Sequence, residues 1–169
     1  MKNRWYTSDL HAFHDNIVNY CNRPIGDKIH NEWILDIVNK GVKSTDITTH
    51  MGDLVGSRKG YKYADLLAFM KQLEGHWRFI KGNHDNEEQL KSLCKDSGHE
   101  YLGVYHEERI EDKSFVLFHF PIENWHKKHY GSIHLHGHVH NTPSNRIENR
   151  YNVCLDKEHK IYNIEELIL

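Results

Sequence analysis

Five short blocks of polar residues each follow an apolar or β-branched run in this sequence. They carry carboxylates, imidazoles and one side-chain amide, and no cysteine lies among them. Oxygen and nitrogen donors of this kind suit manganese, iron, zinc or cobalt, whereas structural zinc sites favour thiolates. The blocks are Asp9-Leu10-His11, Gly52-Asp53, Gly82-Asn83-His84-Asp85, His119 and Gly137-His138-Val139-His140.

Two of the blocks repeat the same spacing of two residues. In an extended segment, residues i and i+2 point to the same side, so Asp9 and His11 could hold one ion together. The pair has an ordinary explanation too, because such residues are common in surface turns. The pair His138 and His140 is more specific, since a row of histidines beside apolar residues is difficult to explain as ordinary core. Gly137 is expected to end the strand and to leave His134 and His136 beside the site or partly exposed.

The potential ligands are too many for one tetrahedral ion. A carboxylate has two oxygens and can bridge two cations, and Asp53 is the candidate for that role, although an aspartate after glycine also serves as a turn residue or helix cap. Two ions roughly 3.5–4 Å apart form a clamp for in-line displacement at phosphorus. His84 is not needed as a ligand and is therefore the catalytic candidate, as a proton donor. The seven candidate metal ligands are Asp9, His11, Asp53, Asn83, His119, His138 and His140.

The elements that would position these blocks alternate between strand and helix in the first half of the chain. Apolar periodicity predicts strands over 5–8, 45–51 and 76–80, and helices over 14–21, 27–41, 63–73 and 86–95, with Asp27 as a helix cap. A polar loop is expected over 56–60. The second half shows short strands over 101–110, 115–118, 133–135, 150–155 and 161–164, with turns at 111–113 and 156–159. We expect two sheets with helices outside, with parallel strands first and antiparallel strands later.

Composition sets the remaining bounds. The 169 residues favour one domain over 1–169. The net charge of −2 with neutral histidines does not indicate capture of nucleic acid by charge. No apolar run reaches the length of a membrane span, so no membrane association is expected. The three cysteines, Cys21, Cys94 and Cys154, are expected to be reduced thiols, which favours a cytoplasmic location.

The order of the five blocks resembles that of the calcineurin-like metallophosphoesterases. The first block extends to His14-x-Asn16 and Cys21-Asn22-Arg23-Pro24, and the last begins at Ser132; both extensions are similar to a small bacterial and phage branch of that family. The resemblance implies an α/β fold, a four-layer α/β/β/α sandwich of two mixed sheets. It implies two divalent transition-metal ions, with manganese favoured and iron, zinc, nickel or cobalt as alternatives. One ion would bind Asp9, His11, Asp53 and His140, and the other Asp53, Asn83, His119 and His138.

The resemblance also implies a reaction. A hydroxide that bridges the two ions would attack the phosphorus of a phosphoric ester in line, and His84 would protonate the leaving oxygen or stabilise charge on the phosphate. Many members orient this histidine with an aspartate at the position of Gly56, so the partner of His84 is open. Asn83, Arg23 and His14 are candidate substrate contacts. A guanidinium recognises phosphate in a bidentate manner, but a surface arginine in a proline loop fits Arg23 equally.

Three functions remain in view from the sequence. The first is hydrolysis of a phosphomonoester or phosphodiester in a phosphorylated small molecule or nucleotide. The second is a phosphodiesterase or nuclease that acts on cyclic nucleotides or nucleic-acid ends. The third is a non-catalytic protein-interaction scaffold on the same fold. Loss of the ligands or of His84 would favour the scaffold, and all of them are present. The sequence sets no oligomeric state.

Overall fold

The computed structural model describes residues 3–56, 61–143 and 145–168. Residues 57–60 of the expected polar loop lie outside this part. A first sheet has the order β4-β3-β2-β1-β9, in which β1 to β4 are parallel and β9 is antiparallel to β1. Its strands are β1 (Arg4–Thr7), β2 (Ile47–His50), β3 (His76–Ile80), β4 (Glu100–Gly103) and β9 (Tyr162–Asn163).

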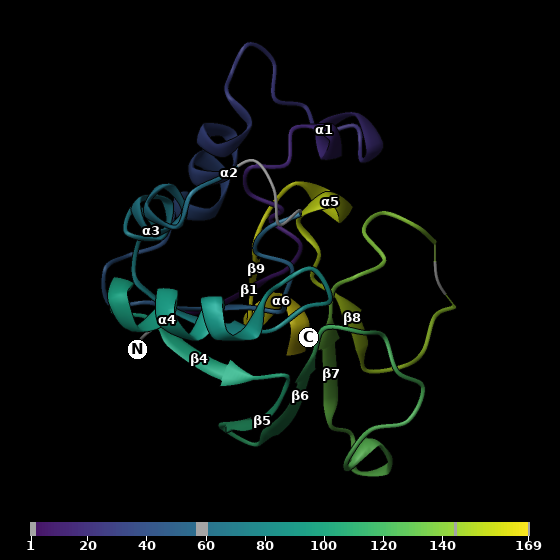
Figure 1. Cartoon of the computed structure of the whole chain (residues 1–169). Helices are drawn as coiled ribbons and strands as arrows, with labels where there is room; N and C mark the ends of the chain where they lie inside the picture. The colour runs from purple at the N-terminus through teal and green to yellow at the C-terminus, as the bar shows by residue number, and fades with distance from the viewer. Residues whose placement is uncertain (1–2, 57–60, 144, 169) are drawn as a thin grey trace.

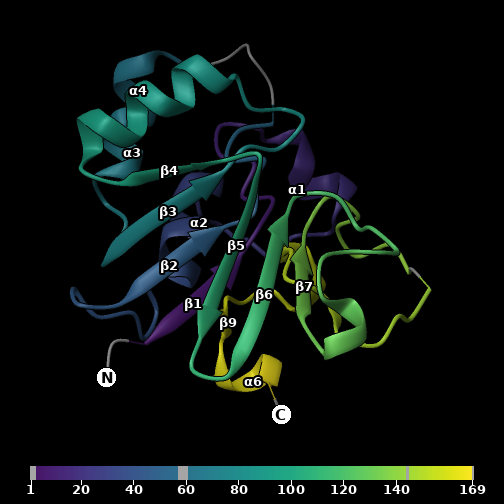
Figure 2. The ribbon, with the colours of Figure 1, turned by 90° about the horizontal axis from the view of Figure 1, so that it is seen from below.

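A second sheet has the order β5-β6-β7-β8 and packs against the first (Figure 2). The turn expected at 111–113 joins β5 to β6 in an antiparallel pair, but β6, β7 and β8 are parallel. The expectation of antiparallel strands in the second half is therefore wrong for these pairs. The connection over 119–132 is a crossover long enough to return the chain to the start of the sheet. The strands are β5 (Tyr105–Ile110), β6 (Lys113–Phe118), β7 (Ile133–His136) and β8 (Arg150–Asn152).

Val104 separates two strands where the sequence predicts one over 101–110. The strand β4 belongs to the first sheet and β5 to the second, so the chain changes sheets at this residue. The positive φ of 97° at Gly103 allows the sharp change of direction. The alternating exposure of β5 shows that one of its faces meets the first sheet.

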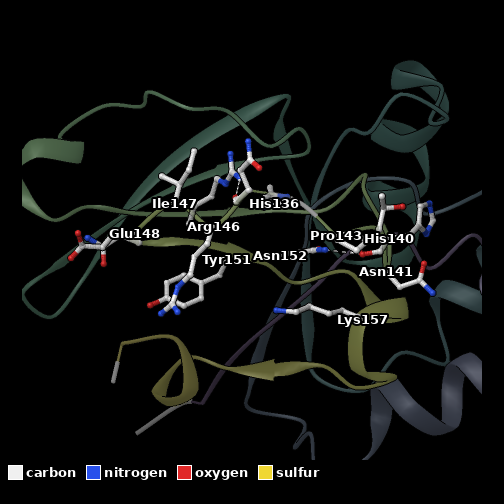
Figure 3. A pocket seen from close by; sticks show the side chains of 14 residues that line it. His136, His140, Asn141, Pro143, Arg146, Ile147, Glu148, Tyr151, Asn152 and Lys157 are labelled. Atoms are coloured by element: carbon white, nitrogen blue, oxygen red, sulfur yellow. Dashed lines mark hydrogen bonds between the residues drawn. The ribbon is translucent and has the colours of Figure 1, made fainter.

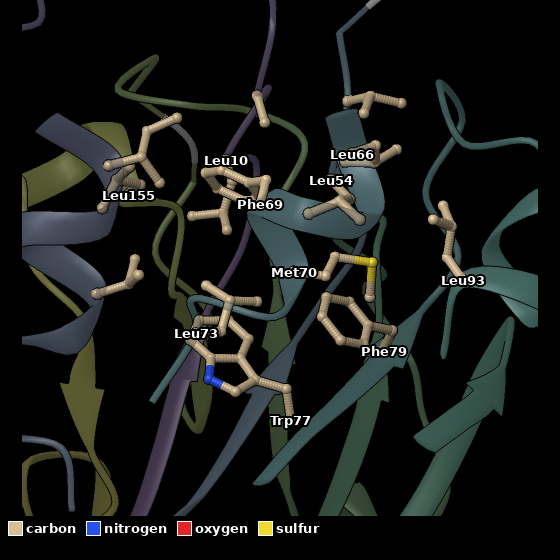
Figure 4. Packing of buried hydrophobic residues seen from close by; sticks show 14 of the residues in the cluster. Leu10, Leu54, Leu66, Phe69, Met70, Leu73, Trp77, Phe79, Leu93 and Leu155 are labelled. Carbon is tan, nitrogen blue, oxygen red and sulfur yellow. The ribbon is translucent and has the colours of Figure 1, made fainter. Parts of the chain in front are cut away.

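Three helices cover the outer face of the first sheet (Figure 1). They are α2 (His30–Asn39), α3 (Tyr63–Met70) and α4 (Glu87–Ser97), and α1 (Asn16–Tyr20) lies apart from them near the end of the sheet. Trp77 and Phe79 of β3 pack under Phe69, Met70 and neighbouring leucines in one apolar cluster (Figure 4). This cluster anchors the strands whose ends carry the polar blocks.

Helix boundaries follow local capping for α4 and differ from expectation for α2. Asn86 accepts a hydrogen bond from the backbone N–H of Gln89 at 2.9 Å, and Gly98 ends the helix in a left-handed conformation. In contrast, α2 begins at His30 with Ile29 at its N-cap, so the assignment of Asp27 as the cap is wrong. The N-cap is thus displaced by two residues, and Ile29 lies on the surface, 66% exposed.

The outer face of the second sheet is covered by the segment 119–132, whose helical part is the 3-10 helix η1 (Lys128–Tyr130). Trp125 of this segment is buried against His134 of β7. Two short helices follow β8, α5 (Leu155–Glu158) and α6 (Glu165–Ile168). The turn expected at 156–159 is therefore wrong, because α5 occupies most of it. The two mixed sheets with helices outside are confirmed.

No helix in the three described ranges is long and apolar enough to cross a membrane.

Candidate active site

The segments that follow β1, β2, β3, β6 and β7 meet at one place. The backbone N–H of Asp9 donates to the carbonyl of Gly52 at 3.0 Å, which joins the segments after β1 and β2. The N–H of Gly137 donates to the carbonyl of His119 at 3.0 Å in the second sheet. The N–H of His138 donates to Asp9 Oδ2 at 2.9 Å and links the two sheets. The five polar blocks therefore come together in space.

Two glycines allow this close approach. A Cβ on Gly82 would lie 2.1 Å from Asp53 Oδ1, and a Cβ on Gly137 would lie 2.2 Å from Asp9 Oδ2. Real Cβ atoms do not come so close, so a side chain at either position would displace a carboxylate of the site. Only glycine therefore fits at positions 82 and 137 without displacing these carboxylates.

Five of the candidate ligands adopt left-handed backbone conformations that are rare outside glycine. Their φ values are 59° for Asp9, 49° for His11, 60° for Asp53, 68° for His138 and 48° for His140. The extended geometry assumed for the i, i+2 pairs is therefore wrong, because both members of each pair have a positive φ and lie beyond the end of their strand. Strain of this kind persists where surrounding contacts hold it, and it concentrates at functional sites.

One group of donors surrounds Asp9. The imidazole Nε2 of His11 lies 3.8 Å from Asp9 Oδ1 and 3.9 Å from Asp53 Oδ2. The Nε2 of His140 lies 3.7 Å from the same Asp9 oxygen, and its ring stacks on that of His11 with centroids 5.0 Å apart. These separations leave room for a cation between the donors.

A second group surrounds Asn83. Its Oδ1 lies 2.8 Å from His119 Nε2 and 3.0 Å from His138 Nδ1. His119 Nε2 is 3.4 Å from Asp53 Oδ2, so Asp53 borders both groups. The structure thus brings all seven candidate ligands together, in two groups that share one carboxylate.

Several donor atoms of the two groups lack a hydrogen-bond partner among the described residues and could instead bind divalent cations. Asp9 Oδ1 and both ring nitrogens of His11 are buried without a hydrogen-bond partner among the described residues. Such atoms are costly unless they meet a ligand. Burial by itself raises the pKa of Asp9, but the nearby histidines His11, His119 and His140 outweigh it and hold the pKa below its usual value. Asp53 has a lowered pKa for the same reasons, through His119.

Contacts behind the donors fix their directions. The Nδ1 of His119 donates to the carbonyl of Met51 at 2.9 Å, which leaves Nε2 free to face Asp53. The buried carboxylate of Asp85 accepts hydrogen bonds from the backbone N–H groups of Asp53 at 2.8 Å and Gly82 at 2.9 Å. Asp85 therefore holds two of the five blocks in register.

His84 lies at the exposed rim of the site. Its Nε2 is 3.9 Å from Asp53 Oδ2, and its backbone N–H donates to Asp53 Oδ1 at 2.8 Å. No acceptor within the described ranges holds its imidazole. At Gly56, where the resemblance to the metallophosphoesterases would place an orienting aspartate, an added Cβ would lie 2.3 Å from the ring of His14. The His14 ring therefore excludes a side chain at that position.

Of the candidate substrate contacts, Arg23 is corrected by the structure. Its guanidinium is buried, and its donors bind Asp156, His30 and the carbonyls of Asp9 and Leu10. Burial and the guanidinium charge lower the pKa of His30 to about 4, so its neutral Nε2 accepts from Arg23. No donor is left for a phosphate. Arg23 belongs to the frame of the site.

His14 remains at the site, half-buried with its ring centroid 6.1 Å from that of His11. His134 and His136 do not, because both are fully buried and bind main-chain carbonyls of Val116 and Gly137. Of the two expected positions, beside the site or partly exposed, partial exposure is wrong. The His134 ring packs against Trp125 of the covering segment, and His136 lines the cavity that adjoins His140.

Asp156 is the main residue that the sequence did not indicate as part of the site. It accepts a hydrogen bond from His140 Nδ1 at 2.7 Å. Burial by itself raises its pKa, but hydrogen bonds from His140 and Arg23 lower the value to about 2. Asp156 follows the strand-like run 150–155, as the other polar blocks follow theirs, and this position could have marked it as a candidate.

A cavity of about 910 Å³ adjoins His140 on the side away from the other donors. It runs between residues 141–143 and 145–150 on one side and Lys157 on the other (Figure 3). The side-chain amide of Asn152 donates to the His140 carbonyl at its edge. The His140 ring points away from most of the lining side chains in Figure 3. This cavity therefore lies behind the donor groups, not over them.

No family model matches the chain. An uncharacterized protein, MJ1445 of Methanocaldococcus jannaschii, is 30% identical over 118 residues, which cover 69% of this chain. The match spans 64% of the archaeal protein's length. The Gene 66 protein of Mycobacterium phage L5 is 25% identical over 168 residues, covering 83% of this chain and 78% of the phage protein.

Solved structures share the fold at low identity. A protein of unknown function from Aquifex aeolicus has a TM-score of 0.74 at 22% identity, over 99% of this chain and 98% of its own. The phosphoesterase Yfce from E. coli has a TM-score of 0.55 at 15% identity, over 90% of this chain and 78% of its own. An archaeal phosphodiesterase has a TM-score of 0.52 at 18% identity, over 90% of this chain and 82% of its own.

Proposed function

Because the chain has the calcineurin-like metallophosphoesterase fold, we propose that it is a metal-dependent phosphoric ester hydrolase. The observation that carries the proposal is the pair of donor groups joined by Asp53, with Asp9 Oδ1 and the His11 nitrogens buried and unpartnered. Asp9, His11, Asp53 and His140 would hold one divalent ion, and Asp53, Asn83, His119 and His138 the other. When bound, such ions lower the pKa of water and draw charge from phosphate oxygens.

The residues of the chain have separate tasks in the proposed reaction. Asp53 and Asp9 supply the negative charge that cations require, and the histidines supply neutral nitrogen donors. Burial and neighbouring imidazoles lower the pKa of His138, which favours its neutral form. His84 stands at the open rim, where it can deliver a proton to the leaving oxygen as the phosphorus–oxygen bond breaks. His14, beside His11, and Asn83, beside His119, would contact the phosphate.

The substrate is proposed to be a phosphorylated small molecule or a nucleotide, as a monoester or a diester. Manganese is the proposed metal, with iron, zinc, nickel or cobalt as alternatives. A cytoplasmic location is proposed on the three free cysteines, Cys21, Cys94 and Cys154, which suit a reducing compartment.

The experiment is turnover of p-nitrophenyl phosphate and of bis-p-nitrophenyl phosphate with added Mn²⁺. We expect the wild type to hydrolyse at least one ester. The corresponding phenyl esters test His84, because their poorer leaving group needs a proton: on them His84→Ala should lose roughly 10²–10⁴-fold in kcat, the usual contribution of a positioned general acid. His76→Ala is a matched control, because the His76 side chain is 47% exposed, as is that of His84, at the other end of β3. It should leave kcat unchanged.

The relative rates on the two esters separate a monoesterase from a diesterase. A wild-type protein that binds Mn²⁺ and cleaves neither ester would contradict the enzyme and favour a protein-interaction scaffold. Equal activity of His84→Ala and the wild type on the phenyl esters would contradict the role of His84 alone.

A further inference from the structure

Arg23 and Asp156 form a buried ion pair behind His140. Arg23 Nε donates to Asp156 Oδ1 at 2.6 Å, and Arg23 Nη2 donates to Oδ2 at 2.9 Å. Arg23 is 4% exposed and Asp156 is 2% exposed. Such a pair costs desolvation energy and contributes little net stability on its own. Its position relative to the donors suggests what it contributes instead.

The same guanidinium holds the segment that carries the first ligands. Its Nη1 donates to the carbonyl of Leu10 and its Nη2 to the carbonyl of Asp9, both at 2.7 Å. Asp9 and His11 have φ values of 59° and 49°, so their conformation depends on contacts of this kind. Arg23 therefore ties the strained first block to Asp156.

Asp156 in turn fixes the ring of His140. Arginine can only donate, so both oxygens of Asp156 act as acceptors. The contact of 2.7 Å between Asp156 Oδ2 and His140 Nδ1 is therefore a hydrogen bond that the histidine donates. The proton of a neutral His140 is then on Nδ1, and the Nε2 lone pair faces Asp9 Oδ1 at 3.7 Å. A carboxylate behind a ligating histidine in this way sets its tautomer and orientation.

We propose that Arg23 and Asp156 are positioning residues that together set His140, Asp9 and His11 around one cation. The inference rests on the proposed metal centre and deepens it. The pair acts on one of the two donor groups, because the other is oriented separately, through the hydrogen bond from His119 Nδ1 to the carbonyl of Met51. The guanidinium is a part of the frame and does not touch the substrate.

The test is metal binding by Asp156→Asn, measured by titration calorimetry with Mn²⁺ and by elemental analysis after dialysis. We expect the dissociation constant of one ion to rise roughly 10–100-fold, as for other residues behind metal-ligating histidines, while the second ion stays bound. Arg23→Lys keeps the charge but loses the bidentate geometry, and it should weaken the same ion.

Glu108→Gln is the matched control. It removes a partly buried carboxylate from an arginine pair that joins two other elements, in which Glu108 accepts from Arg78 at 2.9 Å. It lowers stability without touching the donors, so it should keep both ions. Folded fraction is measured by circular dichroism in each variant, and binding is compared per folded chain.

The outcomes separate this inference from the proposed function. A wild type that binds no Mn²⁺ would defeat the metal centre itself. A wild type that binds two ions, with Asp156→Asn binding both at wild-type affinity, would overturn the positioning role alone. Equal loss of the ion in Glu108→Gln would assign the effect to stability and would overturn it as well.

Discussion

Asp53 is the side chain on which both donor groups depend. Its Oδ2 lies 3.9 Å from His11 Nε2 and 3.4 Å from His119 Nε2, in different groups. Its Oδ1 accepts from the backbone of His84, so the same carboxylate also sets the position of the proposed acid. A single residue thus couples metal binding to the placement of His84.

Asp53→Asn should lower the occupancy of both metal sites. The amide keeps the shape of the carboxylate but loses its charge and one acceptor oxygen, so it cannot bridge two cations. Elemental analysis after dialysis is the measurement, with the exposed Asp27→Asn as control. Loss of only one ion would contradict a bridging role.

At the scale of secondary-structure elements, the site depends on tight turns at the ends of strands. The turn after β3 approaches the turn after β2 so closely that only glycine fits at position 82. The residues after the turns take left-handed conformations that aim their side chains at one point. The strands bring the ligand residues to one edge of the sheets, and the backbone after each strand sets the direction of their side chains.

Gly82→Ala should remove metal binding, because its Cβ would lie 2.4 Å from the backbone nitrogen of Asp53, which cannot move as a flexible side chain could. Gly98→Ala is the control, since that glycine has φ of 79° and no atom within 4 Å of an added Cβ. It should cost about 1–2 kcal/mol of unfolding free energy through backbone strain alone. Urea unfolding and Mn²⁺ titration measure the two effects. Tight Mn²⁺ binding by Gly82→Ala would argue against the steric account.

At the scale of the whole molecule, the site lies where two sheets meet. Asp9, Asp53 and Asn83 follow strands of the first sheet, whereas His119 and His138 follow strands of the second. Arg78 of β3 reaches across to Glu108 of β5, which also accepts from the Tyr6 hydroxyl at 3.1 Å. Correct packing of the sheets is therefore a condition for both donor groups.

The pair Arg78–Glu108 predicts a pH dependence of stability. Burial raises the pKa of Glu108, but the hydrogen bonds and charge of Arg78 outweigh it and lower the pKa below its usual value. A lowered folded-state pKa gives stability that is fully present above the unfolded value of about 4.3 and is lost as pH falls through the folded value. Glu108→Gln should cost about 2 kcal/mol near neutral pH and progressively less in acid.

Urea unfolding of the wild type and of Glu108→Gln over an acid-to-neutral pH series is the measurement. A difference in unfolding free energy that stays constant into strong acid would show that Glu108 is not held as an ionised partner of Arg78.

The sequence by itself determined which side chains are candidates for the site. The order and types of the five blocks, and the glycines at positions 82 and 137, single out these candidates, because such features are encoded in short local patterns. Strand and helix alternation also predicted two sheets with helices outside, and the topology confirms the two sheets.

Only the tertiary structure decided how these parts are held. Arg23 and Asp156 are 133 positions apart and pair through side chains, so no local pattern marks them as partners. The parallel pairing of β6, β7 and β8 and the burial of Arg23 likewise depend on contacts between distant segments. Periodicity reports which face of an element is buried, but it does not report which distant residue meets that face.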